Sequence, residues 1–230
     1  MKKCLILVIS CQLPMWRKMP ETSKQTWDSS EVEGCEVVYY YGAPVKENTA
    51  KEIYFDIEES YFSMSKKTIK AFDFALDNKD FDYIVRINSS TYVDKNKLME
   101  YISTLPDKNV FAGVEVQATP KWCVGWSYVI SKDVIEKIVA HKSLLRNDIT
   151  DDLSLSYLIN EIQVPYTKLP FASIDKREIG WACVCYNGVD SFEFTDFKDV
   201  KKANSPFYRV KQDYDRTQDK YLMEQLFKNL

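Results

Sequence analysis

The chain is poor in the residues that mark several common classes of protein. It has a single histidine, His141, so a zinc site built from clustered Cys and His ligands is not expected. Its six cysteines include no CxxC pair, and disulfide scaffolds belong mainly to much shorter secreted chains, which favours reduced, mostly buried thiols. No G-x-G-x-x-G motif follows the first apolar run, which argues against a dinucleotide-binding protein of the Rossmann type.

Long apolar runs and an excess of positive charge are also missing. The N-terminal run from Cys4 to Ile9 is far too short to span a bilayer, and it lacks the longer apolar region and cleavage site of a signal peptide. A formal net charge of −3 and a pI near 5.4 argue against non-specific binding to nucleic acids. Hydrophobic residues make up 45% of the 230 residues. This composition is typical of a globular protein with a sizeable core.

Apolar runs that predict strands alternate with amphipathic patterns that predict helices, above all in the first half of the chain. The expected strands are Leu5–Ser10, Glu36–Tyr41, Tyr83–Ile87, Phe111–Gln117, Trp126–Ile130 and Cys183–Tyr186, and 165–173 is expected to be extended or looped. The expected helices are one within 12–30, Glu58–Asn78 with a stripe of Phe62, Ile69, Phe72 and Leu76, Lys95–Thr104, Lys132–His141 with Ser131 as N-cap, Asp151–Ile162 and Thr217–Leu230. This alternation predicts one α/β domain.

A polar triplet, Asn88, Ser89 and Ser90, directly follows the apolar run Tyr83–Ile87. The run has the pattern of a strand buried on both faces, so we expect it in the centre of the sheet. Ligands bind outside the carboxyl ends of strands in open α/β sheets, which makes the triplet a candidate binding site. The same residue types also favour turns and helix caps, so a purely structural role is the alternative.

Several segments, in order, resemble glycosyltransferases of the GT-A fold, and most closely the β-1,3-galactosyltransferase and Fringe-type families. Lys24–Trp27 is similar to their Arg-x-Thr-Trp segment, and Tyr83–Val93 to the strand that leads into the metal-binding Asp-x-Asp motif. Trp122–Ser131 resembles the acceptor-side segment, and Asp151–Ile159 the stretch that supplies the catalytic base. Phe207–Lys211 is like the tail of small bacterial or viral members, whose basic residues lie near the donor phosphates.

The resemblance implies a single GT-A (Rossmann-like) domain, with a central mixed, mostly parallel sheet flanked by helices. Residues 1 to about 94 would bind the nucleotide sugar, and about 95–230 would form the acceptor and catalytic half. The implied reaction is sugar transfer with inversion, in which a carboxylate takes the proton of the acceptor hydroxyl. Asp152 is the candidate base and Asp151 the second choice, although acids are also favoured at a helix N-terminus by its dipole.

The triplet departs from the family pattern where carboxylates would hold Mn²⁺ or Mg²⁺. An amide and two hydroxyls are weak ligands for such ions, and no histidine lies in the tail to complete a metal site. We therefore expect no metal cofactor, with Mn²⁺ or Mg²⁺ held by acids elsewhere, such as Asp94 or Asp151, as the alternative. Basic residues would then neutralise the leaving diphosphate. The candidate donor-binding residues are Ser10, Arg86, Asn88, Ser89, Ser90, Arg209, Lys211 and Arg216.

Aromatic residues in the acceptor-side segment suggest the second substrate. Trp122, Trp126 and Tyr128 are suited to stacking on the C–H faces of sugar rings, with core packing as the alternative. The expected partners are thus a nucleotide-sugar donor and a glycan acceptor. Golgi members of the family carry an N-terminal membrane anchor, and no apolar run of this sequence is long enough to be one. A cytoplasmic enzyme of a bacterium or a virus-infected cell is therefore expected. The neutral triplet leaves a second reading open, that of an inactive carbohydrate- or nucleotide-binding protein with the same fold.

Overall fold

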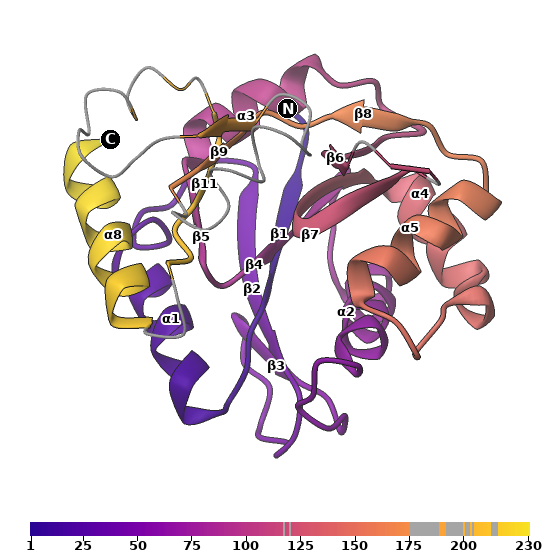
Figure 1. The fold of residues 1–230 in the computed structure, drawn as a ribbon, viewed down its shortest axis with the longest axis horizontal. Helices are drawn as coiled ribbons and strands as arrows, with labels where there is room; N and C mark the ends of the chain where they lie inside the picture. Colours follow the sequence, from indigo (N-terminus) through magenta and orange to yellow (C-terminus); the bar gives the residue numbers. More distant parts are fainter. Residues whose placement is uncertain are drawn as a thin grey trace.

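A seven-stranded mixed sheet forms the centre of the protein in its computed structural model (Figure 1). The model describes residues 1–116, 118–119, 121–174, 189–191, 200, 203, 205–212 and 216–230. The strand order is β3 (Glu52–Tyr54), β2 (Cys35–Tyr41), β1 (Cys4–Ile9), β4 (Tyr83–Asn88), β7 (Trp122–Ser131), β6 (Phe111–Val116) and β8 (Tyr166–Lys168). Only the pairings of β7 with β4 and β6 are antiparallel. The predicted central place of Tyr83–Ile87 is confirmed.

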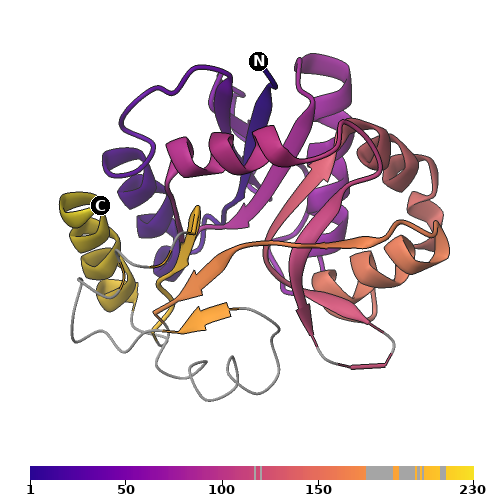
Figure 2. The same ribbon diagram turned by 90° about the horizontal axis from the view of Figure 1, so that it is seen from above.

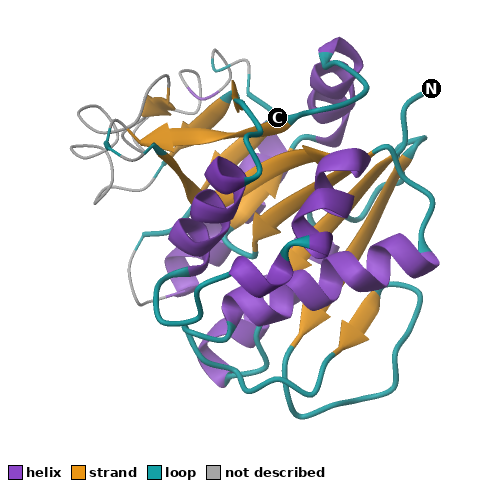
Figure 3. Ribbon diagram, turned by 90° about the vertical axis from the view of Figure 1, so that its right-hand side faces the viewer, coloured by secondary structure: helices purple, strands orange, loops and turns teal. Residues whose placement is uncertain are grey.

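Helices cover both faces of this sheet, because alternate residues of its strands are apolar on both sides. Leu5 and Leu7 of β1 pack in one core with α2 (Met64–Asn78), α4 (Lys132–Ala140) and α5 (Asp151–Glu161). Ile6 and Val8 pack in the other core with α1 (Pro14–Gln25), α3 (Lys95–Thr104) and α8 (Arg216–Asn229). Figure 3, seen from the side of α2, α4 and α5, shows several helices in front of the strands. The predicted α/β fold with a mostly parallel sheet between helices is confirmed.

A second, four-stranded sheet brings the C-terminal part of the chain to the central strand. Its order is β10 (Val189–Ser191), β9 (Phe171–Ser173), β11 (Phe207–Arg209) and β5 (Thr91–Val93). Figure 2 shows β9, β10 and β11 gathered beside the main sheet, near α8. Strand β5 follows the polar triplet directly, and Arg209 pairs with Thr91 in antiparallel register. This pairing places the basic tail next to the end of β4.

The helix expected from Glu58 begins only at Met64. Ser60 and Ser63 explain the late start, because their side chains bond to local backbone groups: Ser60 N donates to Ser63 Oγ at 3.1 Å, and Ser63 Oγ donates to Ser60 O at 2.8 Å. Such local bonds compete with helix formation. Phe62, assigned to the apolar stripe of this helix, therefore lies outside it, with 59% of its surface exposed.

Other boundaries also differ from the prediction. Strand β7 extends over ten residues rather than five, because its first half pairs with β6 beyond a register shift between Gly113 and Glu115. Helix α1 begins at Pro14 and continues through Pro20. Proline is suited to the first turn because the N–H groups there have no acceptor within the helix. Ser131 is the N-cap residue of α4, but its hydroxyl donates to Asp133 Oδ1 at 2.6 Å and caps no backbone N–H.

Several short elements were not predicted individually. A separate 3₁₀ turn at Lys142–Leu144 follows α4, and β3, β5, β8 and β9 each span three residues, too few for an alternating pattern. The expected strand Cys183–Tyr186 lies outside the described residues. Four cysteines, Cys4, Cys11, Cys35 and Cys123, are free thiols that are buried or half-buried, as expected. In the described part of the chain, no helix combines the length and the apolar character needed to cross a lipid bilayer.

Candidate functional site

A cavity of about 510 Å³ opens where β1 and β4 reach their carboxyl ends. Its lining comes from distant parts of the sequence: the ends of β1 and β4, the start of α1, the segment before α2, the middle of β7, the start of α5 and the basic tail. The lining residues are Ile9, Ser10, Cys11, Leu13, Trp16, Glu59, Ser60, Tyr61, Met64, Lys67, Asn88, Ser89, Ser90, Gly125, Trp126, Asp151, Asp152, Arg209, Lys211 and Arg216. Ten of the thirteen residues predicted for the site are among them.

The floor of the cavity is the polar triplet, supported from below by Arg86. This side chain is fully buried, and its Nη1 donates to Asn88 Oδ1 at 3.0 Å and to the carbonyl of Gly125. Its Nη2 forms an ion pair with Asp151. Burial disfavours the charged guanidinium, yet the Asp151 carboxylate raises the pKa of Arg86 above its ordinary value. Arg86 is thus a permanent buried cation that touches the cavity through Asn88.

The first turn of α5 supplies two neighbouring carboxylates with different surroundings. Asp151 is held by Arg86, although burial raises the pKa of its carboxyl. Asp152 accepts hydrogen bonds from Gly125 N at 3.3 Å, from Leu153 N at 3.0 Å and from the Thr150 hydroxyl. Within the described residues no cation lies at ion-pair distance from Asp152. Asp151 is therefore committed to neutralising Arg86, whereas Asp152 presents a carboxylate to the cavity.

Gly125 of β7 allows this arrangement. A Cβ atom at this position would lie 3.2 Å from Asp152 Cβ and 3.6 Å from Asp151 Oδ1. The first distance is tighter than most real Cβ contacts, so any side chain here would push the start of α5 away from β7. A glycine in the middle of a strand often marks a close backbone approach of this kind.

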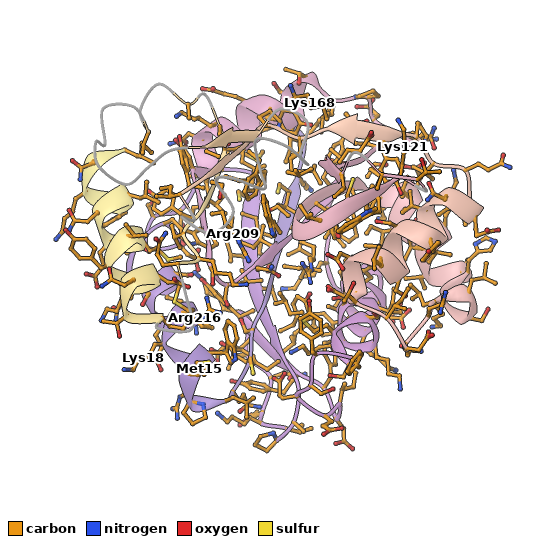
Figure 4. All side chains as sticks on the ribbon, viewed as in Figure 1. Met15, Lys18, Lys121, Lys168, Arg209 and Arg216 are labelled. Carbon is orange, nitrogen blue, oxygen red and sulfur yellow. The ribbon has the colours of Figure 1, made fainter. Side chains whose placement is uncertain are left out.

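Arg216, the first residue of α8, lines the cavity near Met15 and Lys18 of α1 (Figure 4). Its Nη1 donates to Asp219 Oδ2 at 2.6 Å and lies 3.5 Å from Ser90 Oγ, and its guanidinium stacks over the Trp16 ring at 3.8 Å. Asp219 is fully buried and also accepts from Gln212 N at 2.8 Å. Nε of Arg216 is buried and has no hydrogen-bond partner among the described residues. The guanidinium is thus held in one position beside the triplet.

Two more cationic side chains line the cavity together with Arg216. Arg209 at the end of β11 is 5% exposed, and its guanidinium lies 5.6 Å from the ring centre of Trp126. Lys211 follows it in the chain and is half-buried. With Arg216, they form the cationic wall of the cavity, and Asp151 and Asp152, which line the same cavity, form its acidic wall.

A buried ion pair at the end of β1 was not predicted. Lys67 Nζ donates to Glu59 Oε2 at 2.6 Å and to the carbonyl of Ser10 at 2.8 Å, and both side chains are almost fully buried. Glu59 Oε1 accepts from Gly42 N at 2.7 Å. The helical spacing could have indicated that Lys67 is buried, because this residue lies in one row with Met64, Ala71 and Ala75 on the inner side of α2. No comparable sequence pattern indicates that Trp16 and Tyr61 line the cavity.

The three predicted acceptor aromatics occupy different places. Trp126 lines the cavity and packs on Phe171, with ring centres 5.2 Å apart. Tyr128 is 1% exposed and donates its hydroxyl to Cys123 O at 3.2 Å within the core. Trp122 is half-buried at the start of β7, paired with Val116. In the part of the chain that the structure describes, neither Tyr128 nor Trp122 lines the cavity, so both occupy the packing role considered as the alternative.

The triplet does not fit a divalent metal. Its side chains are an amide and two hydroxyls. The carboxylate nearest to Ser90, that of Asp219, accepts from Ser90 Oγ at 3.3 Å and is paired with Arg216. Hard cations require anionic oxygen ligands. Asp94, the alternative ligand, caps α3 by accepting from Lys97 N at 3.1 Å. Among the described residues, no three His, Cys, Asp or Glu side chains are grouped as a metal site would require.

This chain is similar in fold to a solved structure, whereas sequence comparisons give no match. No protein-family model matches the chain, and no curated protein matches it in sequence. A solved structure does match: a glycosyltransferase involved in the glycosylation of the major capsid of PBCV-1, with a TM-score of 0.58 and 14% identity. The match covers 96% of this chain and 99% of that one, so this protein shares a glycosyltransferase fold over nearly its full length.

Proposed function

We propose that this protein is an inverting glycosyltransferase that moves a sugar from a nucleoside diphosphate sugar to a hydroxyl of a glycan or similar acceptor, without a divalent metal. The observation that carries the proposal is a cavity at the carboxyl ends of β1 and β4 that is lined by a cationic wall and by the Asp152 carboxylate. The motifs that resemble the β-1,3-galactosyltransferase and Fringe-type families support it, and so does the fold shared with the capsid glycosyltransferase.

Asp152 is the general base in this proposal. It takes the proton from the acceptor hydroxyl as that oxygen forms a bond to the anomeric carbon, while the bond from this carbon to the phosphate oxygen breaks. The nucleoside diphosphate leaves with the electron pair. Asp151 is unsuited to the role, because protonating it would leave the buried charge of Arg86 without its partner. Gly125 N and the Thr150 hydroxyl hold Asp152 in place.

The diphosphate lies against the cationic wall in this proposal. Arg209, Lys211 and Arg216 make charge-assisted hydrogen bonds to the phosphate oxygens and neutralise the charge that grows on the leaving group. Arg216, 3.5 Å from Ser90 Oγ and paired with Asp219, offers guanidinium N–H groups beside the triplet, where the resembling families hold a metal. Ser10, Ser89 and Ser90 offer hydroxyls to the donor.

Arg86 acts on the donor through Asn88. Because its Nη1 donates to Asn88 Oδ1, the Asn88 amide is oriented with its oxygen toward Arg86. The NH₂ group is then the part of the amide that is left to donate a hydrogen bond to the donor. Arg86 is therefore a positioning residue in this proposal.

Calorimetric titration of UDP and GDP, each with EDTA and with Mn²⁺, tests the donor site. The proposal expects one nucleotide to bind equally well under both conditions. Binding that disappears with EDTA and returns with Mn²⁺ would overturn metal independence. Release of nucleoside diphosphate from UDP- and GDP-sugars is then measured with EDTA present. Tight nucleotide binding without any turnover would favour the second reading, a binding protein, for which the neutral triplet is the supporting observation.

A further inference from the structure

Two adjacent aromatic rings stand exposed at the mouth of the cavity. Tyr61 and Phe62 are each 59% exposed, which makes them the most exposed aromatic side chains among the described residues. Their ring centres are 6.2 Å apart with an interplanar angle of 86°, so the two rings form a right-angled corner. Tyr61 lines the cavity itself.

The backbone that carries these rings is anchored on both sides. Glu59, before them, is held by Lys67 and by Gly42 N, and Lys67 in turn bonds the carbonyl of Ser10 on the cavity wall. Ser63, after them, bonds the carbonyls of Glu58 and Ser60. The exposure of the rings is therefore built into a fixed segment. A preorganised surface of this kind loses little entropy when a ligand binds.

Tyr61 lines the same cavity as Asp152. Burial raises the pKa of the Tyr61 hydroxyl; the charges of Asp152 and Asp151 raise it further, whereas those of Arg209 and Arg86 lower it, so the phenol is within electrostatic reach of both carboxylates and of Arg209. Donor phosphates would be attracted to the cationic wall rather than to the uncharged rings of Tyr61 and Phe62. A neutral acceptor, by contrast, must place its hydroxyl beside Asp152.

We infer that Tyr61 and Phe62 form the acceptor subsite, which binds the apolar C–H face of a pyranose ring and so selects a glycan as acceptor. This inference rests on the proposed function and adds the residues that bind its acceptor. A sugar ring stacked on Tyr61 shields the aromatic surface from water while its hydroxyls remain solvated or face the cavity. The corner geometry suits a ring that stacks on one aromatic face and meets the other at its edge.

The test measures binding apart from turnover. Saturation-transfer NMR is recorded with the methyl α- and β-glycosides of glucose, galactose, mannose and N-acetylglucosamine, with UDP or GDP present, and the glycoside with the strongest signal is titrated. In the variant Tyr61→Ala/Phe62→Ala, its affinity should fall about tenfold or more. Tyr61→Phe keeps the ring and should bind within about twofold of the wild type.

Phe227→Ala is the matched control, since Phe227 is a 45% exposed aromatic on α8 that does not line the cavity in the described part of the chain. It should bind the glycoside as the wild type does. The inference is overturned if no glycoside binds the wild type, or if the double alanine variant binds it unchanged. A loss of UDP and GDP affinity in the double variant would instead assign the corner to the donor. Failure of the wild type to bind either nucleotide counts against the proposed function alone.

Discussion

The two walls of the cavity are built in different ways. The acidic wall is made of consecutive residues in one helix turn, and main-chain geometry sets its position, since Gly125 lets α5 approach β7 closely. The cationic wall comes from the last part of the chain, and side chains set its position: Trp16 stacks on Arg216, and Asp219 is buried against it. The acidic wall should therefore tolerate changes at nearby positions other than Gly125, Thr150 and Arg86. The cationic wall should respond to the loss of single side chains.

The sharpest contrast is expected within the acidic wall. Asp152→Asn should lower turnover by about 10²–10⁴, the range for loss of a general base, while the affinity for the nucleotide stays within twofold. Steady-state rates with EDTA present, together with calorimetry, measure both quantities. Asp148→Asn, which changes an exposed acid just before α5, is the control and should leave the rate unchanged. If Asp152→Asn transfers sugar at the wild-type rate, Asp152 only stabilises the helix terminus.

Asp151, next to Asp152, should affect the stability of the fold. Asp151→Ala removes the partner of a fully buried cation and should lower the free energy of unfolding by about 3–5 kcal/mol. Urea denaturation of Asp151→Ala and Asp152→Ala, side by side, measures the difference. Equal stability of the two variants would contradict the separate roles of the carboxylates. Replacing both partners, as in Arg86→Met/Asp151→Leu, should restore part of the lost stability, because no unpaired charge remains.

The cationic wall should show its effect in binding. Arg209→Ala or Lys211→Ala should weaken nucleotide binding roughly ten- to a hundredfold, because each removes a charge-assisted bond to phosphate in a partly desolvated site. Calorimetry with EDTA present measures the change. Lys121→Ala removes an exposed lysine far from Arg209 and Arg216 in Figure 4, and should bind as the wild type does. An equal loss in that control would mean that only the overall charge matters.

The smallest expected effect tests the main-chain part of the comparison. Gly125→Ala introduces a Cβ 3.2 Å from Asp152 Cβ, which should shift α5 by a few tenths of an ångström. Turnover should fall by about threefold to tenfold, because small displacements of a catalytic group are costly. Nucleotide affinity, which depends on the other wall, should be unchanged. A variant that weakens binding but not turnover would show that the two walls are not independent.

Much of the fold could be predicted from the sequence, because its strands and helices are long and strongly patterned. The apolar run of β4 predicted a central strand, and the regular pattern of α3 predicted its bounds. Short strands such as β3 and β5 could not be predicted, since three residues show no period. The start of α2 was misplaced because side chains of Ser60 and Ser63 bond the local backbone, which apolar spacing does not reveal.

The sequence by itself determined the α/β class, the central place of β4 and the residue types of the triplet, because these depend on local pattern alone. Only the tertiary structure decided which predicted residues face one cavity. It placed Arg86 beneath the floor, tied Asp151 to it, buried Tyr128 and brought Arg216 to Ser90 from the other end of the chain. The physical reason is that ion pairing and burial depend on contacts between residues far apart in sequence, which no local pattern encodes.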